Sequence, residues 1–448
     1  MLSKNINLQN LFSSLIFISL LNLVFNPINL YLGFLILLFF VLIFIYIQIS
    51  NFALLPFYFY PFLFIFKIKY PEYLLFSVLP ELSIFVSFIY VFFDQKIKKS
   101  EKYLFFLVIL LSFSLTFSNF LFIFDIYFLP ALIRQYALPI IFLIFFIAVS
   151  LNNHQLPREA FRICIIAYGL ISIIALLNYF DVINVLQINV YRYFSGCSNN
   201  IIQTFLTCKN LALLRINPLL GGSIGTSGSL LLMLAIANIL NYKKKEILII
   251  FFSIPLIFSA FFSISFSTII PITFAVAVIF LSKYRIYFKQ IFLVLIILFI
   301  LFMINFSFAG EKSFFSYFKL TILTSLIDHY SKINLLNIFF GSGPIINSSK
   351  FGYFPNHFIQ DIGILRILTE SGIFNFFLVI LILLYFLKKS IWIVVNYPSN
   401  YNKSLLIMFL TLISSIHTII FLGIPFYPLF VMIVSNIILQ YNLLNKTS

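Results

Sequence analysis

Apolar residues along this chain come in long runs rather than in the alternating or amphipathic patterns of a soluble protein. Most runs approach 20 residues, the length that a helix needs to cross the hydrocarbon core of a bilayer. Backbone polar groups in lipid must be satisfied within their own segment, so we predict that each run is a helix. The runs occupy residues 10–25, 30–49, 52–67, 72–93, 103–122, 136–151, 161–178, 218–241, 247–263, 267–282, 290–306, 373–387, 404–421 and 425–441.

The number of spans depends on the third run, which Pro56 and Pro61 interrupt. We therefore predict an all-α polytopic membrane protein with 12–14 transmembrane helices, forming a single integral membrane domain over residues 1–448. Composition agrees, because 62% of the residues are hydrophobic and only 9% are charged. Soluble domains carry about a quarter of their residues as charged side chains. No soluble basic domain remains that would bind nucleic acid.

Charges in the short connections predict how the spans are oriented. With the N-terminus inside, inside loops carry 17 of the 28 Lys and Arg residues. The short loops 94–102 and 242–246 determine the predicted orientation most strongly, because positive charge in short loops marks the cytoplasmic side. Both termini are therefore expected in the cytoplasm. No small-residue cleavage site follows the first run, so we expect a retained helix rather than a removed signal peptide.

Two connections are much longer than the others. Loop A spans about 179–217 and loop B about 307–372, and both are expected outside. Long loops in compact architectures are usually functional or disordered. Neither is a low-complexity tract, and both contain apolar stretches, so we expect them to fold onto the membrane surface.

Loop B carries the strongest candidates for chemistry. His357 and Asp361 are four residues apart, so on a helix they share a face. Arg366 follows His357 by nine residues, about half a turn away on a straight helix, so both address one ligand only if Gly363 bends it. The functional interpretation is a base, His357 or Asp361, beside a phosphate-binding cation. The alternative is a solvated helix end stabilised by local ion pairs.

Loop A ends with Arg215, just before a Pro- and Gly-rich turn that opens the next helix. A guanidinium can grip a diphosphate through two parallel hydrogen bonds, whereas the alternative is an arginine that snorkels to headgroups. Arg192 is a weaker version of the same candidate. Cys197 and Cys208, in the same loop, can form a disulfide outside the cytoplasm or remain free thiols.

Other polar positions are weaker candidates. Glu81 is an intramembrane acid, either functional or a protonated packing residue. Serines around residues 259–268 line a polar cavity or merely satisfy helix ends. The turn at 341–344 presents backbone N–H groups to phosphate or is simply flexible. No metal-binding spacing occurs, so neither a metal nor another cofactor is expected.

Two motifs together resemble a known family. R-x-N-P-x-x-G begins at Arg215, and G-x-G-P followed by N-H-F-I-Q-D-I-G-I-L-R-I-L-T-E-S-G-I begins at Gly341. With the many spans and two long outside loops, they resemble the O-antigen polymerase family (Wzy-type), which is related to O-antigen ligases. The chain departs from many relatives in having no arginine after the serines at 263–267, and Asp328-His329 where an arginine is common.

The resemblance implies a metal-independent glycosyltransferase of the bacterial inner membrane. It would transfer a growing glycan from undecaprenyl diphosphate to the sugar end of a lipid-linked repeat unit, yielding O-antigen or capsule-type polysaccharide. By this resemblance Arg215 binds diphosphate, and His357, Asp361 and Arg366 match the charged motif of the last outer loop. The implied partners are undecaprenyl-diphosphate-linked oligosaccharide and membrane lipid, with a chain-length regulator and a flippase as further candidates.

Two other functions fit the same general features. A ligase-like glycan transferase would differ only in its acceptor, which the sequence does not reveal. A lipid-linked oligosaccharide flippase, which is not an enzyme, would have about the same number of spans. A transporter of that kind should show repeat symmetry and several midplane charges, neither of which is present here.

Overall fold

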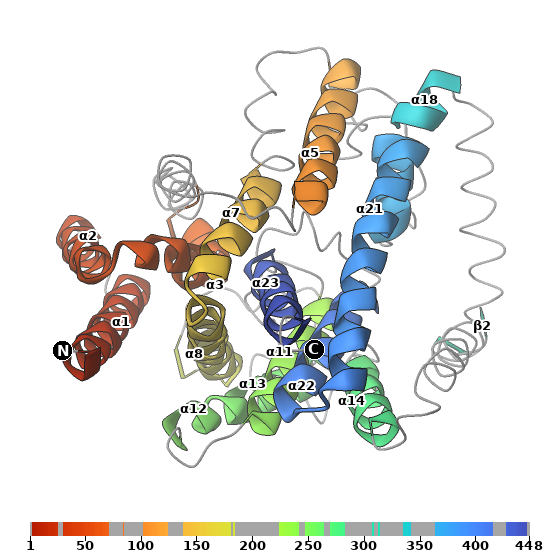
Figure 1. The fold of residues 1–448 in the computed structure, drawn as a ribbon. Helices are drawn as coiled ribbons and strands as arrows, with labels where there is room; N and C mark the ends of the chain where they lie inside the picture. Colours follow the sequence, from red (N-terminus) through yellow and green to blue (C-terminus); the bar gives the residue numbers. More distant parts are fainter. Residues whose placement is uncertain are drawn as a thin grey trace. The chain divides into compact units, whose positions relative to one another are not determined.

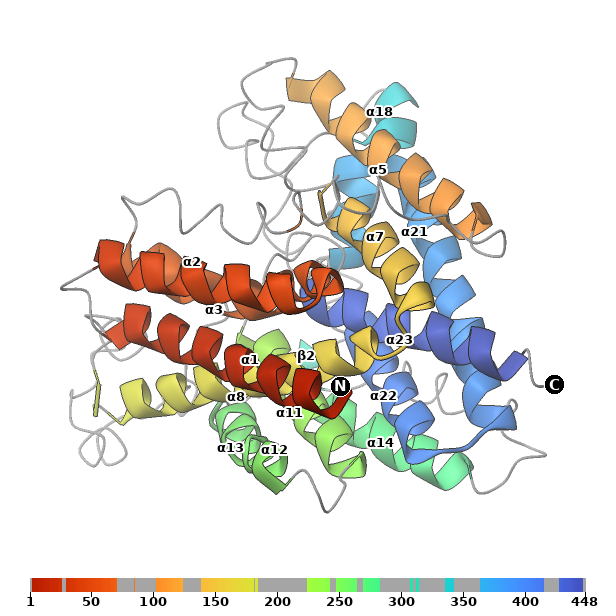
Figure 2. The ribbon, with the colours of Figure 1, turned by 60° about the vertical axis from the view of Figure 1, so that its left-hand side comes forward.

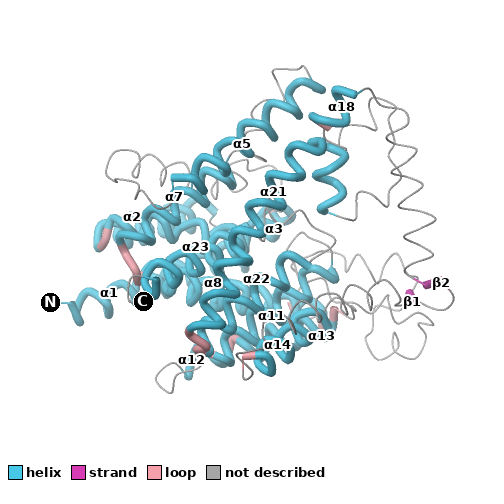
Figure 3. The backbone as a smooth tube through the Cα atoms, turned by 45° about the vertical axis from the view of Figure 1, so that its right-hand side comes forward, coloured by secondary structure: helices cyan, strands magenta, loops and turns pink. Residues whose placement is uncertain are grey.

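The described part of the chain is helical apart from short connections and one small strand pair (Figure 3). The pair is antiparallel, with Ser307 opposite Ser313 and Phe308 opposite Lys312. The computed structural model describes residues 2–25, 30–70, 84, 102–123, 138–180, 182–183, 224–241, 247–263, 269–282, 307–308, 312–313, 335–341, 363–414 and 427–445.

The helices and strands follow one another along the chain as Figure 1 labels them. Their bounds are α1 Leu2–Phe25, α2 Leu30–Ile47, the 3-10 helix η2 Ile49–Leu54, α3 Leu55–Lys69, α5 Lys102–Ile123, α7 Leu138–Asn152, α8 Leu156–Tyr179, α11 Ile224–Leu240, α12 Ile247–Phe251, α13 Ser253–Phe262, α14 Ile269–Leu281, β1 Ser307–Phe308, β2 Lys312–Ser313, α18 Leu335–Phe340, α21 Gly363–Asn396, α22 Asn400–Ser414 and α23 Tyr427–Asn445.

Twelve of the 14 predicted runs contain described helices. The other two, 72–93 and 290–306, lie outside the described residues except for Ile84. The third run is confirmed as a helix, because α3 continues through Pro61. The run 247–263 differs from the prediction, since α12 and α13 divide it at Phe252.

Membrane-spanning length is reached by four of the described helices. They are Leu8–Phe25, Leu156–Tyr179, Ser371–Asn396 and Tyr427–Asn445. Six further apolar helices are shorter, between 10 and 17 residues. An all-helical membrane protein is thus confirmed, whereas the number of spans stays a prediction.

The chain folds into two compact units, each built from separate stretches of sequence. Unit 1 combines residues 1–96, 145–269 and 424–439, and unit 2 combines 97–144, 270–423 and 440–448. Helices α7 and α23 are divided between the two. The prediction of a single integral membrane domain stays a prediction.

Helices α1 and α3 of unit 1 run in the same direction, with α2 beside α1 (Figure 2). Gln9 donates a hydrogen bond to Asn51, and the hydroxyls of Ser13 and Tyr58 lie 2.6 Å apart. The partners are 42 residues apart in sequence in the first pair and 45 in the second. A later residue of α1 therefore contacts a later residue of the η2–α3 segment, as in parallel helices. Parallel neighbours are what the predicted topology requires of its first and third spans.

The end of α3 caps the end of α1. Lys69 Nζ donates to the carbonyl oxygen of Val24, and the Tyr70 hydroxyl donates to that of Leu23 at 2.5 Å. The last four carbonyl groups of a helix have no hydrogen-bond partner within the helix. These two bonds therefore supply partners for carbonyl groups at the end of α1. Burial lowers the pKa of Lys69 and raises the pKa of Tyr70.

We expect Lys69→Met to destabilise the folded protein by about 1 kcal/mol, because a cation near a helix C-terminus is worth up to roughly that amount. Thermal unfolding of the purified protein should show a lower midpoint. Lys69→Arg should retain most of the stability. Lys388→Met, at an exposed position, serves as the control; an equal effect there would contradict the capping role.

Helices α8 and α13 of unit 1 are also parallel. A Cβ atom on Gly169 would lie 2.7 Å from the Phe252 ring, and ten residues further along both segments Tyr179 and Phe262 have ring centroids 5.6 Å apart. The missing side chain at Gly169 therefore lets the ring of Phe252 approach the α8 backbone closely.

Helix α11 runs antiparallel to α13. Asn238 near the end of α11 donates to Ser253 Oγ at 2.7 Å, at the start of α13. Asn436, at the middle of α23, donates to the Pro157 carbonyl at the start of α8, at 3.1 Å. Neighbouring helices in unit 1 thus have the relative directions of alternating membrane crossings.

In unit 2, helices α5, α18 and α22 pack against α21. The rings of Phe386 and Phe409 meet edge to face between α21 and α22, with centroids 6.3 Å apart. Near the end of α21, Trp392 meets Tyr441 at 4.9 Å, and Lys389 Nζ lies 4.5 Å from the centre of the same Tyr441 ring. Aromatic and cation–π contacts therefore hold this end of α21.

Candidate functional site

Most of the predicted site residues lie outside the described residues. These are His357, Asp361, Arg215 and Arg192. The same holds for Glu81 and for the two loop A cysteines. Arg366 and Glu370 fall in the first part of α21, where the backbone is described but their side chains are not. The assigned roles of all these residues stay predictions.

The helix that carries Arg366 breaks at Gly372. Its backbone angles there are φ 80° and ψ 173°, between a segment from Gly363 and a longer one that ends at Asn396. This combination of angles is essentially restricted to glycine. The break separates the segment with Arg366 from the apolar helix that continues to Asn396. The sequence prediction of a span beginning at 373 coincides with it.

Gly372 lies against the end of α18. A Cβ atom there would press on the Phe339 carbonyl and come within 2.5 Å of the Gly341 nitrogen. Real Cβ atoms essentially never approach another atom within 3.0 Å. Gly341 also has a positive φ, 88°. The two glycines allow backbone to meet backbone, and Figure 1 shows α18 beside one end of α21.

The contact joins the two ends of the segment that holds the loop B candidates. Between Gly341 and Gly372 lie His357, Asp361 and Arg366. When the two ends of a loop are held together, the entropy cost of bringing them together is already part of the fold. Functional side chains also work best when the elements that bear them are held in place. We name this contact between Gly341 and Gly372 the glycine clamp.

Asn375 accommodates the break in α21. Its Nδ2 donates to the Ser371 carbonyl at 2.7 Å, and its Oδ1 is buried without a hydrogen-bond partner. Both residues are buried, with exposed fractions of 0% for Asn375 and 1% for Ser371. The free amide oxygen can accept a hydrogen bond from an O–H or N–H group. It lies one turn from the glycine clamp, on the helix that carries Arg366.

Only two of the serines predicted around residues 259–268, Ser259 and Ser263, are described, since residues 264–268 lie outside the described residues. Ser263 donates to the Ala260 carbonyl at 2.6 Å, so it satisfies a helix end. Ser259 is buried and its Oγ has no partner, and the same is true of Ser227 in the first turn of α11. Ser227 precedes Asn238 by three turns, so both lie on the face toward α13.

Metal chemistry finds no support in the described residues. No group of three or more His, Cys, Asp or Glu side chains is close enough there to hold a metal ion. Cys164 in α8 is a free thiol with 0% exposure, as expected of a packing residue.

Sequence reasoning missed three residues that the structure makes prominent. Gly372 directly precedes the predicted run 373–387, and the pair Ser371-Gly372 is a turn signal that indicates a break there. Asn375 is the only Asn of the predicted span 373–387 and was not considered. Arg162 lies within the predicted run 161–178 and within α8, where its Nε atom is buried without a hydrogen-bond partner.

Comparison with known proteins gave no significant match to any family model, curated protein or solved structure. The resemblance to O-antigen polymerases therefore rests on the two motifs that begin at Arg215 and Gly341.

Proposed function

We propose that this protein is a membrane glycosyltransferase that polymerises undecaprenyl-diphosphate-linked repeat units into O-antigen or capsule-type polysaccharide on the outer face of the inner membrane. The glycine clamp is the observation that carries the proposal. It joins the ends of a charged segment in a chain that has few charges, and it adjoins an apolar helix of spanning length. A lipid-linked sugar requires polar chemistry at such a boundary.

The reaction needs a base and cations but no metal. The acceptor sugar hydroxyl attacks the anomeric carbon of the donor glycan, and the bond from that carbon to the diphosphate oxygen breaks. His357 or Asp361 takes the hydroxyl proton. Arg215, Arg366 and Arg192 are proposed to stabilise the charge that develops on the departing undecaprenyl diphosphate.

The accompanying topology is 12–14 membrane crossings, with both termini in the cytoplasm and loops A and B outside. Parallel α1 and α3, parallel α8 and α13, and the antiparallel α11 and α13 support alternating crossings. The lipid tails of donor and acceptor would enter sideways between helices. A single Asn375 oxygen with no partner in the described structure offers one further acceptor for a substrate hydroxyl.

The outside placement of loop B has a direct test. Lys350→Cys, in a chain whose native cysteines have been replaced, should react with a membrane-impermeant thiol reagent applied to intact cells whose outer barrier is permeable to it. Lys388→Cys, at the opposite end of the α21 span, should react only after the membrane is opened. Labelling of Lys350→Cys only after rupture would exclude an outer site.

The glycan profile of a deletion strain tests the function itself. Loss of a polymerase should leave the acceptor capped with one repeat unit, and the plasmid-borne gene should restore the ladder of longer chains. A cap with no repeat unit at all would identify a ligase. Lipid-linked repeat units trapped on the cytoplasmic face would identify a flippase, and the polymerase assignment would then be wrong.

A further inference from the structure

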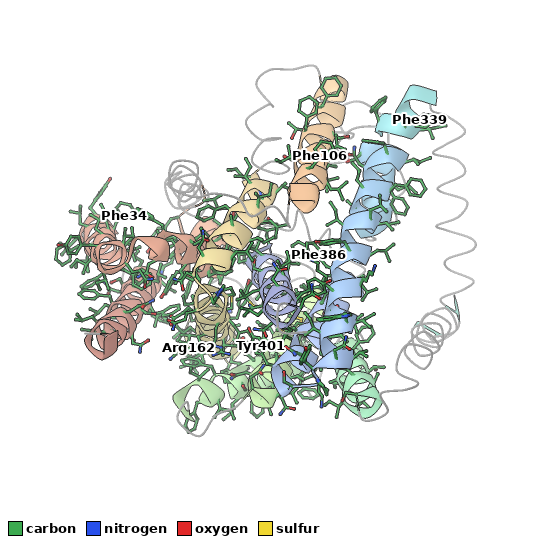
Figure 4. The ribbon with its side chains drawn as sticks, viewed as in Figure 1. Phe34, Phe106, Arg162, Phe339, Phe386 and Tyr401 are labelled. Atoms are coloured by element: carbon green, nitrogen blue, oxygen red, sulfur yellow. The ribbon has the colours of Figure 1, made fainter. Side chains whose placement is uncertain are left out.

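One narrow stripe of α21 is exposed along the apolar part of that helix. Between Ser371 and Val395, the exposed side chains recur at spacings of three and four residues. Positions three and four apart lie on the same face of a helix, so these side chains form a single stripe. Its members are Phe374, Phe377, Leu381, Leu384 and Lys388. Phe386 lies on the opposite face, where it is fully buried and its ring meets that of Phe409 (Figure 4).

Lys388 ends the exposed stripe with a cation. The four members before it are apolar, with exposed fractions between 42% and 58%. No hydrogen bond, ion pair or ring contact of Lys388 occurs in the described part of the structure. Its neighbour Lys389 is held differently, since Lys389 Nζ lies 4.6 Å and 4.5 Å from the ring centres of Tyr385 and Tyr441. Lys388 is therefore a cation that a ligand on the exposed stripe can reach.

The exposed stripe has the length of one lipid leaflet. It belongs to a helix of spanning length, Ser371–Asn396. Lys388 follows Phe377 by 11 residues, which is about 16 Å along an α-helix. Half of a hydrocarbon core of about 30 Å is about 15 Å. An acyl chain that lies along the apolar side chains would thus bring its headgroup to the level of Lys388.

Aromatic side chains with polar tips gather at the same end of α21. Trp392 follows Lys388 by about one turn, and its ring centre lies 4.9 Å from that of Tyr441 and 6.0 Å from that of Tyr397. Trp and Tyr are enriched where a membrane meets water, because the ring is apolar and the N–H or O–H group is polar. This grouping places the Lys388 end of the exposed stripe at headgroup level.

A second copy of the chain matches the exposed stripe less well than a lipid does. Two copies in one membrane share an orientation, so a two-fold pair would set each stripe against the same residues of the other. Lys388 would then face Lys388, and like charges across an interface repel. An amphiphile with an apolar chain and an anionic headgroup complements both parts of the stripe.

We propose that the exposed stripe binds an anionic phospholipid. An acyl chain covers Phe377, Leu381 and Leu384, and the Lys388 ammonium donates hydrogen bonds to oxygens of the headgroup phosphate. The site lies within unit 2 and does not depend on the glycosyltransferase proposal.

The chain has a single tryptophan, which reports the lipid beside the site. Nanodiscs of one composition, phosphatidylcholine with a minority of phosphatidylglycerol, carry bromine on the acyl chains either of the phosphatidylglycerol or of an equal amount of the phosphatidylcholine. Bromine quenches Trp fluorescence at short range. For the full wild-type chain, quenching of Trp392 should show about a fivefold local preference for phosphatidylglycerol, corresponding to the roughly 1 kcal/mol that one lysine contributes near an anionic surface.

Lys388→Met should reduce this preference to about one, and it should fold normally because the side chain is exposed. Arg158→Gln removes an exposed cation from unit 1 and should keep the full preference. A wild-type chain without a preference, or an unchanged preference in Lys388→Met, would refute the lipid site.

A second reporter tests the apolar part of the exposed stripe. Leu384→Trp, combined with Trp392→Phe, places the fluorophore on the stripe itself, and it should show the same Lys388-dependent preference. If neither brominated lipid quenches this reporter, a second copy covers the stripe and the proposal is wrong. It is also wrong if inorganic phosphate abolishes the preference where chloride at equal ionic strength does not, since the ligand would then be free phosphate.

Discussion

Replacing Gly372 by alanine should reduce glycan polymerisation by about 100-fold, the loss that a misplacement of roughly 1 Å causes in a positioned site. Alanine cannot easily adopt the backbone angles found there, which cost about 1–3 kcal/mol for a residue other than glycine. Its Cβ would also press on backbone atoms of Phe339 and Gly341, which cannot rotate away. Helix α18 must therefore move off α21. The measurement is the glycan ladder at matched membrane abundance.

A matched control is available in Gly33→Ala. There a new Cβ would meet the Leu23 Cδ2 atom at 2.9 Å, and that atom is the free end of a flexible side chain. We expect it to leave the ladder close to wild type. Cysteines at Phe340 and Ser371 should cross-link in the parent chain and much less with Gly372→Ala. A normal ladder together with lost cross-linking would show that the glycine clamp does not position the reaction.

His357→Ala should lower polymerisation by about 100–10,000-fold if His357 is the base, the range typical of general acid–base catalysis. Asp361→Asn should then cost less, as expected of a residue that orients the base. If Asp361 is the base, the order of the two losses reverses. The ladders of both variants at equal abundance distinguish these cases.

Arg215 provides the companion test on the donor side. Arg215→Ala should cost about 100–1,000-fold, because charge on the departing diphosphate would lose a fixed donor. Arg215→Lys keeps the charge but loses the paired geometry, so its activity should lie between the two. Lys403→Gln, on the predicted cytoplasmic side, controls for loss of a positive charge. Full-length ladders from both Arg215→Ala and His357→Ala would refute the assigned site.

The helices were the most predictable part of this protein. Long apolar runs leave few alternatives, because lipid cannot satisfy a free backbone, and α1, α2, α5 and α7 end within about two residues of prediction. Even the doubtful third run became a helix, since its two prolines fall at the start of α3 and at a position that neighbouring helices enclose. The start of α8 was less predictable, because the helix begins at Leu156, five residues before the predicted run 161–178.

The candidate site could be predicted only as a segment. Sequence spacing brought His357, Asp361 and Arg366 to attention, but it could not show that Gly341 and Gly372 meet. That contact depends on two backbone conformations and on α18, a six-residue helix with no periodic signal of its own. Asn375 could not be singled out from the sequence, because its importance arises from the break at Gly372. Next to that break the Ser371 carbonyl accepts a hydrogen bond from the Asn375 side chain.

The contact between α23 and α8 has a consequence for how the protein is made. Helices α1 to α3 can assemble once about 70 residues have been synthesised, since their contacts lie within that length. The Asn436 bond to Pro157 spans 279 residues. At roughly 5–20 residues per second, α8 would wait about 15–55 seconds for its partner. During that interval the start of α8 must be shielded by lipid, by the insertion machinery or by a chaperone, which makes late truncations more harmful to unit 1 than their length suggests.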